Sequence, residues 1–345
     1  MAAVQTSGGA EHSLRDAAID VWREWLVVVH KPRRLAIVKE RDEQRKRISR
    51  ANANIAARLD FSLALRKNGS IACWGGVEDQ DSPDGIQGDF VMVAAGHSHT
   101  LALQRDGNIA CWGRNGAGQA PPDGIQGGFV AIAAGGAHSL ALQRNGSIAC
   151  WGDNEYDQAP PDGIQGDFIM VAAGDFHSLA LQRDGNIACW GDNEYGKAPP
   201  GGIQGDFIMV AAGAVHTLAI RRDGSIACRG RNYDGEAPPD GIQGDFVAIA
   251  AGIAHSLALQ RDGSIACWGR NTNGQAPPDG IQGDFVAIAA GDFHSLAIRR
   301  DGSIACWGAN YDGEAPTPEH DEEYEVDEYA TLSANFPFMT DVHIL

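Results

Sequence analysis

The stretch FVAIAAGDFHSLAIRRDGSIACWGANYDGEAP, at residues 285–316, recurs along the chain with small changes. It contains three short apolar runs, at 285–290, 294–298 and 303–307. One cysteine falls in each copy, and successive cysteines are separated by 38 residues once and by 39 thereafter. These markers are Cys73, Cys111, Cys150, Cys189, Cys228, Cys267 and Cys306. A fixed period of this length indicates a repeat architecture, here of seven units.

Each repeat carries Asp-Gly or Asn-Gly between its second and third apolar runs. The dipeptides are Asn68-Gly69, Asp106-Gly107, Asn145-Gly146, Asp184-Gly185, Asp223-Gly224, Asp262-Gly263 and Asp301-Gly302. Such a dipeptide between apolar runs is the strongest short-range signal of a β-hairpin, and it predicts a type I′ turn with positive φ at both central residues. No stretch within the repeats keeps a helical period for long, which excludes the helical repeat arrays.

Seven β units can stack as an open solenoid or close into a ring, and two observations favour the ring. Propellers typically have about 4–8 blades, and closure leaves only short, protected edges. The first apolar run also ends in Ala-Ala-Gly in nearly every copy, which suits strands that crowd together at a central axis. We therefore predict an all-β fold, a seven-bladed β-propeller of repeats about 39 residues long.

Two of the seven units are irregular. In the first, residues 54–57 align with the first apolar run but lack its glycine, and Phe61 replaces the repeated histidine. In the fifth, Arg229 replaces a repeated tryptophan, so we expect the packing of that blade to be the weakest. The tryptophans expected between blades are Trp74, Trp112, Trp151, Trp190, Trp268 and Trp307. We expect the propeller to span residues 52–318, between an N-terminal extension (1–51) and a C-terminal tail (319–345).

The two terminal segments differ in charge. In the extension, Leu14, Val21 and Trp25 fall on one face of a predicted α-helix that ends at Pro32, and this helix either covers the propeller or binds a partner. Residues 31–50 carry nine basic and three acidic residues, which is typical of a solvated helix face, with a nuclear-import or anionic-surface signal as the alternative. Residues 319–328 carry seven acidic residues and no Lys or Arg, which predicts a flexible tail.

The composition restricts the partners and the compartment. The formal net charge of −18 opposes direct binding of nucleic acid by the propeller, because the phosphate backbone would repel it. No apolar run is long enough to span a membrane, and the N-terminus does not read as a signal peptide. The odd number of cysteines, one per repeat, indicates reduced thiols. We expect a monomer in the cytoplasm, with the nucleus as the alternative.

The pattern AAGxxHSLALxxDGxIxxWGxNxxGQ resembles the repeat of the regulator of chromosome condensation family. One copy contains Ala250-Ala251-Gly252, His255-Ser256, Asp262-Gly263, Trp268-Gly269, Asn271 and Gly274-Gln275. The resemblance covers about three-quarters of the chain and implies a seven-bladed propeller, whereas a WD repeat fits worse. The short repeat is similar to that of the bacterial propeller that inhibits β-lactamases. Family members include a nucleotide exchange factor, ubiquitin ligases, a UV-B photoreceptor and an inhibitor, so the resemblance does not determine the function.

Candidate chemistry centres on a histidine that recurs before Ser or Thr. Its copies are His99, His138, His177, His216, His255 and His294. They could form a metal-binding or basic ring, but catalysis needs different residues with distinct roles, so the repetition favours one local hydrogen bond made six times. Residues 153–157 and 271–274 faintly resemble calcium loops but lack the full ligand series. We predict no catalytic residue, no metal, no cofactor and no enzymatic activity.

The expected strand directions place two variable stretches on one face of the propeller. These are the residue pairs before the repeated histidine and the residues after Trp-Gly, while Ala-Pro-Pro to Gly-Ile-Gln-Gly returns along the outside without completing a regular strand. The candidate partner-binding residues on this face are Tyr156, Tyr195, Tyr233, Tyr311, Phe176, Phe293, Arg114, Arg231, Arg270, Asp153, Glu155 and Asp192. Tyr and Arg are enriched at interface hot spots. The alternative is that these loops only diverged after duplication.

These features predict a non-catalytic module, a scaffold or adaptor that binds a protein partner on one propeller face. Two alternatives follow from the family resemblance. One is a guanine-nucleotide exchange factor or other regulator of a small GTPase. The other is the substrate-recognition part of a ubiquitin ligase that lacks its own HECT domain, since residues 319–345 are too few to form one.

Overall fold

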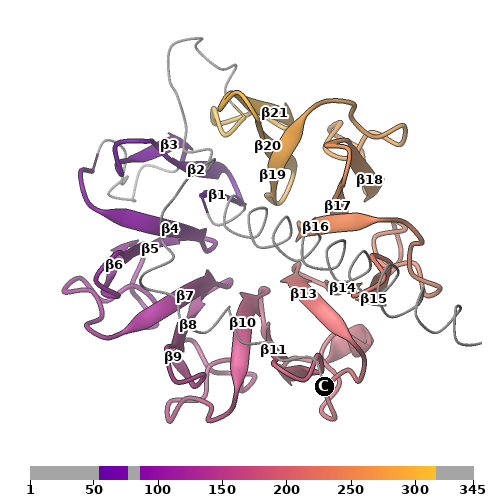
Figure 1. Cartoon of the computed structure of the whole chain (residues 1–345). Coiled ribbons are helices and arrows are strands. Elements are labelled where there is room, and N and C mark those ends of the chain that lie inside the picture. The colour runs from indigo at the N-terminus through magenta and orange to yellow at the C-terminus, as the bar shows by residue number, and fades with distance from the viewer. Residues whose placement is uncertain (1–53, 77–85, 316–345) are drawn as a thin grey trace, which may run out of the picture. The chain divides into compact units, whose positions relative to one another are not determined.

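The computed structural model describes residues 54–76 and 86–315, which contain seven antiparallel sheets of three strands each. Each sheet is one repeat, and we number the blades 1 to 7 in chain order (Figure 1). The blades are β1 (Ile55–Arg58), β2 (Phe61–Leu65) and β3 (Ile71–Gly75); β4 (Phe90–Ala95), β5 (His99–Gln104) and β6 (Ile109–Gly113); β7 (Phe129–Ala134), β8 (His138–Gln143) and β9 (Ile148–Gly152); β10 (Phe168–Ala173), β11 (His177–Gln182) and β12 (Ile187–Gly191); β13 (Phe207–Ala212), β14 (His216–Arg221) and β15 (Ile226–Gly230); β16 (Phe246–Ala251), β17 (His255–Gln260) and β18 (Ile265–Gly269); β19 (Phe285–Ala290), β20 (His294–Arg299) and β21 (Ile304–Gly308). A short 3₁₀ helix, η2 (Glu194–Gly196), follows β12. The predicted all-β, seven-bladed propeller is confirmed.

The hairpin turn between the second and third strands of each blade is not the predicted type I′ turn. In blade 7, Gly302 N–H donates to Arg299 O (2.9 Å), and Arg299 N–H donates to Ser303 O (2.8 Å). Gly302 has a φ of 89°, but Asp301 does not have positive φ. This arrangement matches a type I turn followed by a glycine bulge. Asp301 is favoured because its Oδ1 accepts the N–H of Ser303 (2.9 Å) and so holds the turn.

The first strands of the blades surround the axis (Figure 1), and their Ala-Ala-Gly sequences place glycines at the closest approach. A Cβ on Gly96 would lie 2.1 Å from Cε1 of His99 and 2.7 Å from the carbonyl oxygen of Gly135 in the next blade. Glycine is therefore required where the strands converge, as the sequence predicted. Blade 1 is the exception, because Arg58 takes the glycine position and Phe61 the histidine position.

In blades 2 to 6, whose residues the structure describes in full, the segment after the third strand returns along the outer edge of the blade without forming a fourth strand. In five blades it makes a single β-bridge to the third strand, such as that between Ile109 and Ile125. The prolines Pro121 and Pro122 precede this bridge, and they have no N–H with which to extend it. The predicted irregular outer segment is confirmed.

Blades 7 and 1 are packed together. Strand β1 contacts both β19 and β20, and Ile55 and Ala64 share one buried cluster with Leu296. The hydroxyl of Ser62 lies 2.8 Å from Nε2 of His294. Contacts between residues more than 200 positions apart close the repeats into a ring, so the open solenoid is excluded.

The predicted helix and basic stretch of residues 1–51 and the acidic tail of 319–345 lie outside the described residues, so the domain limits stay predictions. Among the residues described, no helix is long and apolar enough to cross a membrane. All seven cysteines are free. Burial raises the pKa of six of their thiols to about 12, those of Cys111, Cys150, Cys189, Cys228, Cys267 and Cys306.

Candidate binding face

Two loops of each blade lie at the same end of the ring. One precedes the repeated histidine and the other follows Trp-Gly. Backbone hydrogen bonds join them, for example from Asp153 N–H to Ala137 O (2.8 Å) and from Arg114 N–H to Ser98 O (2.7 Å). We call this end the histidine-loop face, and we call the opposite end, which carries the hairpin turns, the Asp-Gly face. The strand directions predicted from the sequence are therefore confirmed.

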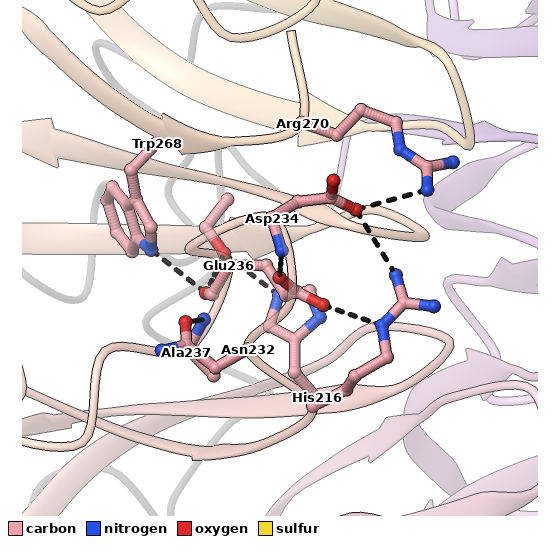
Figure 2. Close-up of polar contacts among 9 residues, drawn as sticks. His216, Asn232, Asp234, Glu236, Ala237, Trp268 and Arg270 are labelled. Atoms are coloured by element: carbon pink, nitrogen blue, oxygen red, sulfur yellow. Dashed lines mark hydrogen bonds and ion pairs between the residues drawn. The ribbon is translucent and has the colours of Figure 1, made fainter.

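Beneath the histidine-loop face, each repeated histidine joins its blade to the next one. Nε2 of His216 in blade 5 lies 2.8 Å from Oγ of Ser256 in blade 6, and Ser256 donates to the carbonyl of Glu236 (3.1 Å). Trp268 donates its indole N–H to the same carbonyl (3.0 Å, Figure 2). Because the serine proton is directed at the carbonyl, His216 has to donate from Nε2.

The same histidine contact recurs at five other blade junctions, with distances of 2.8 to 3.0 Å. Burial is the main cause that lowers the pKa of these imidazoles, to about 4 in His99, His216 and His294, to about 3 in His138 and His255, and well below the usual value in His177. The imidazoles are therefore neutral near pH 7. The predicted repeated hydrogen bond is present, but it joins neighbouring blades, so the prediction of a local bond was wrong.

The junction between blades 4 and 5 lacks one of these hydrogen bonds. Thr217 donates to the carbonyl of Lys197 (2.9 Å), and His177 lies 3.0 Å from the same hydroxyl. In blade 5, Arg229 lies opposite Thr217 on the neighbouring strand, and the side chain of Arg229 is exposed. In blade 6, the equivalent pair is Trp268 opposite Ser256. The carbonyl of Lys197 therefore receives no indole N–H, which makes this junction weaker in hydrogen bonding.

Aromatic side chains are exposed on the histidine-loop face. In the described part of the chain, the exposed large apolar side chains are Tyr156 (47 %), Phe176 (44 %), Tyr195 (44 %), Tyr233 (78 %) and Tyr311 (80 %), and all belong to these loops. The rings of Tyr156 and Phe176 meet edge to face at 5.4 Å, and those of Tyr195 and Tyr233 at 5.8 Å. The structure thus brings four of the predicted aromatic residues together in pairs across blade junctions. Phe293 is half-buried.

Three of the predicted charged residues brace their own loops. They pair with the sixth residue of the loop: Asp153 with Gln158 (3.1 Å), Asp192 with Lys197, and Arg231 with Glu236 (2.7 Å). Burial raises the pKa of Asp192, but the hydrogen bonds from Lys197 and from the backbone of Glu194, together with the charge of Lys197, lower it by more, so the pKa is lowered overall. These three charges are used largely within the protein.

The other charged candidates are more accessible. Arg114 and Glu155 are exposed. Arg270 of blade 6 lies 3.1 Å from Asp234 of blade 5, which also contacts Arg231 (3.6 Å, Figure 2). The face therefore carries ion-paired arginines over blades 5 and 6 and exposed carboxylates over blade 3.

A polar cluster at the axis was not predicted from the sequence. Arg58 of blade 1 forms an ion pair with Asp175 of blade 4 and lies 3.7 Å from Asp292 of blade 7. Its Nη2 is 3.3 Å from Nε2 of His97 in blade 2. Burial, then Arg58, lowers the pKa of His97 to about 4. Two features of the sequence could have indicated this cluster. Arg58 replaces a repeated glycine, and Asp175 and Asp292 each lie two residues before a repeated histidine.

The axial cluster does not form a metal site. Throughout residues 54–76 and 86–315, no group of three or more His, Cys, Asp or Glu is arranged to hold a metal ion. Arg58 occupies the space between the two carboxylates and supplies the positive charge there. The cluster therefore joins blades 1, 2, 4 and 7 across the axis at the histidine-loop face.

The family is established by the repeats themselves. The family model for the regulator of chromosome condensation (RCC1) repeat matches residues 90–119, 129–158, 169–197, 246–275 and 285–314. The chain is an RCC1-repeat propeller. The matches fall in blades 2, 3, 4, 6 and 7 of this RCC1-repeat propeller, and the two unmatched blades are those that lack the repeated histidine or the repeated tryptophan.

Solved structures show the same propeller fold. The ectodomain of the receptor kinase CR4 from Physcomitrella patens matches with a TM-score of 0.62 and 23% identity, over 74% of this chain and 73% of that one. Prp20p from Saccharomyces cerevisiae matches with a TM-score of 0.58 and 19% identity, over 80% and 87%. Yeast RCC1 (Prp20) bound to Kap60 matches with a TM-score of 0.55 and 21% identity, over 68% and 73%. A comparison with curated proteins finds no match.

Proposed function

We propose that this RCC1-repeat propeller is a non-catalytic binding module that holds a protein partner on its histidine-loop face. The observation that carries the proposal is the exposure of Tyr156, Phe176, Tyr195, Tyr233 and Tyr311 on that one face. Tyr is enriched at the energetically dominant positions of protein interfaces. Their rings extend from loops whose backbones are held rigidly, so little entropy is lost when they bind.

The loop backbones are held by repeated side-chain hydrogen bonds. In blade 4, Asn193 Oδ1 accepts the N–H of Ala198 (2.9 Å), and the same bond recurs after the third strand of blades 2 to 7. The sixth loop residue is buried in each case, as with Lys197 at 2 % exposure. A rigid scaffold that carries variable loop tips is a common arrangement in binding proteins.

The Asp-Gly face is a poorer candidate because its charges are already paired. Arg105 lies 2.9 Å from Asp89, and corresponding pairs recur in blades 4 to 7. The turn aspartates accept backbone N–H groups, as Asp184 does from Asn186 (2.9 Å). Because the polar groups of this face already pair with one another, the face offers a partner little apolar area to bury.

Regulation of a small GTPase is a narrower candidate. Two of the fold neighbours are described with protein partners, Prp20p with Gsp1p and histones and yeast RCC1 with Kap60. At their level of identity, these likenesses support the shared fold. A nucleotide-release assay against a panel of small GTPases tests this candidate, and acceleration by the full chain would support it.

The binding face is tested once a partner has been captured from a lysate by affinity purification and identified. Combined substitution of Tyr156, Tyr195 and Tyr233 by Ala should weaken binding of the identified partner by at least about tenfold, because hot-spot residues typically contribute about 2 kcal/mol or more. The matched control substitutes Asp184 and Asp262 on the Asp-Gly face by Asn, which keeps an oxygen acceptor for the turn N–H. Loss of binding in the control alone would contradict the proposal.

A further inference from the structure

We propose that the histidine-loop face over blades 3 and 4 binds a protein segment that carries exposed arginine side chains. The inference rests on the proposed function and specifies the chemistry of the partner. The surface concerned consists of loops 153–158, 175–176 and 192–197, and we call it the aromatic–acidic surface. Three features carry the argument: an internal arginine that blade 5 binds, the replacement of that arginine by aspartate in blades 3 and 4, and the exposed rings and carboxylates of these two blades.

Blade 5 shows how this face binds a guanidinium group. The Cζ atom of Arg231 lies 5.6 Å from the centroid of the Tyr233 ring. Its nitrogens also contact Glu236 (2.7 Å) and Asp234 (3.6 Å). The arginine is thus bound by one aromatic ring and two carboxylates, a combination that uses both its charge and its planar shape.

Blades 3 and 4 have aspartate at the loop position that Arg231 occupies in blade 5. Asp153 accepts a hydrogen bond from the amide of Gln158 (3.1 Å). Asp192 pairs with the buried ammonium group of Lys197, which is the one basic residue in these three loops. The loops carry a tyrosine and exposed carboxylates at other positions than blade 5 does, with Gln158 and Lys197 at the position of Glu236. They offer no accessible cation of their own.

Exposed rings form the apolar part of the aromatic–acidic surface. Tyr156 and Phe176 are 47 % and 44 % exposed and meet edge to face. Tyr195 is 44 % exposed and meets Tyr233, the ring that Arg231 covers. The rings thus continue from the internal guanidinium site of blade 5 toward blade 3. Aromatic faces attract guanidinium groups more strongly when the contact excludes water, which a partner chain laid over the loops would do.

Exposed carboxylates lie beside these rings. Glu155 and Asp157 flank Tyr156 in the chain, and both are exposed. Asp157 has a φ of 63°, in a left-handed conformation that the other described loops give to glycine, such as Gly118 at 84°. In blade 4, the carboxylate of Glu194 lies beside the Tyr195 hydroxyl and raises the pKa of that phenol. The surface can therefore pair charge with arginine while its rings cover the guanidinium plane.

The probe for this inference is a fluorescein-labelled octapeptide of alternating arginine and glycine, with citrulline in place of arginine as the uncharged isostere. The charge-removal variant of the full chain combines Glu155→Gln, Asp157→Asn and Glu194→Gln. The matched control removes three exposed carboxylates from the outer turns, by Asp123→Asn, Asp162→Asn and Asp240→Asn. Fluorescence anisotropy at physiological salt gives the dissociation constants.

The arginine peptide should bind the wild-type chain, and the charge-removal variant should bind it about tenfold more weakly, since three exposed ion pairs are lost. The control variant should bind within about twofold of wild type, and the citrulline peptide should not bind. Equal losses in both variants would show a general effect of net charge and overturn the inference. Unchanged binding by the charge-removal variant would overturn it too.

Failure here is distinguishable from failure of the proposed function. If the Tyr156, Tyr195 and Tyr233 substitutions abolish binding of the captured partner while the charge-removal variant binds it normally, the binding face stands and the arginine inference is wrong. If neither variant affects the partner, the binding face itself is wrong.

Discussion

The blade junctions make one quantitative prediction, which concerns the exceptional junction between blades 4 and 5. Substituting Thr217 by Val removes a buried hydroxyl that contacts His177 (3.0 Å) and donates to the carbonyl of Lys197 (2.9 Å). No tryptophan N–H reaches that carbonyl, because Arg229 stands in its place. The substitution therefore leaves two buried polar groups without partners.

The comparison is Ser256→Ala at the junction between blades 5 and 6. There, the carbonyl of Glu236 keeps the N–H of Trp268 (3.0 Å), so only His216 loses its partner. Each buried polar group left unpaired costs about 1–3 kcal/mol. We expect Thr217→Val to lower the free energy of unfolding by about 2–6 kcal/mol and Ser256→Ala by about 1–3 kcal/mol.

A third substitution, Arg229→Trp, restores the missing indole and should stabilise the chain by about 1 kcal/mol through its hydrogen bond. In that background, Thr217→Val should cost about 1 kcal/mol less than it does alone, a coupling that a double-mutant cycle measures. Urea unfolding followed by circular dichroism gives the free energies, with equal m-values as the check on comparability. Equal losses for Thr217→Val and Ser256→Ala, together with no coupling to position 229, would refute this account of the junctions.

Three further predictions follow from the buried groups. The repeated histidines have lowered pKa values in the folded protein, so their contribution to stability is complete above about pH 6.5 and is lost as the pH falls toward about 4. Acid unfolding followed by circular dichroism should therefore have its midpoint between these two pH values. A chain that stays folded at pH 3 would contradict this prediction. Substituting Arg58 by Met leaves the buried Asp175 and Asp292 without their cation and should lower the free energy of unfolding in urea by about 3–5 kcal/mol. Changing both aspartates to Asn in this variant should restore part of that stability. An unchanged free energy of unfolding in the Arg58→Met variant would show that the axial ion pairs are dispensable. The raised thiol pKa values predict that the cysteines react slowly with a thiol reagent at pH 8 in the folded chain, whereas seven should react after denaturation without reductant; a shortfall would reveal a disulfide.

The fold was predictable because each local signal agreed with the repeat. The Asp-Gly and Asn-Gly dipeptides marked the hairpin between the second and third strands of every blade. The recurring glycine at the axis marked the closest approach of the strands. The turn type was predicted wrongly, since the dipeptide alone does not show that Asp301 keeps negative φ while only Gly302 has positive φ. The dipeptide indicates that a turn is present, but the hydrogen bonds between the two strands at the turn determine its type.

The binding face was predictable in part. Tracing strand directions correctly placed Tyr156 and Phe176 on one face, although they come from different repeats. The partners of Asp192 and Arg231 were not predicted. Each pairs with the sixth residue of its own loop, which is Lys197 in blade 4 and Glu236 in blade 5. Only the folded loop shows that its first and sixth residues contact each other.

The axial cluster was missed for a different reason. Arg58, Asp175 and Asp292 are far apart in the sequence, and each one looked like an isolated departure from the repeat. Only the closed ring brings blades 1, 4 and 7 to a common axis, so the ion pair depends on the tertiary arrangement.

The central claim, that a protein partner binds the histidine-loop face, is tested most directly by hydrogen–deuterium exchange of the full chain with and without the captured partner. The binding face predicts slower exchange on complex formation in loops 153–158, 192–197 and 231–236, with unchanged exchange in the hairpin turns at 184–185 and 262–263. Protection confined to those turns and to the rest of the Asp-Gly face would contradict the claim.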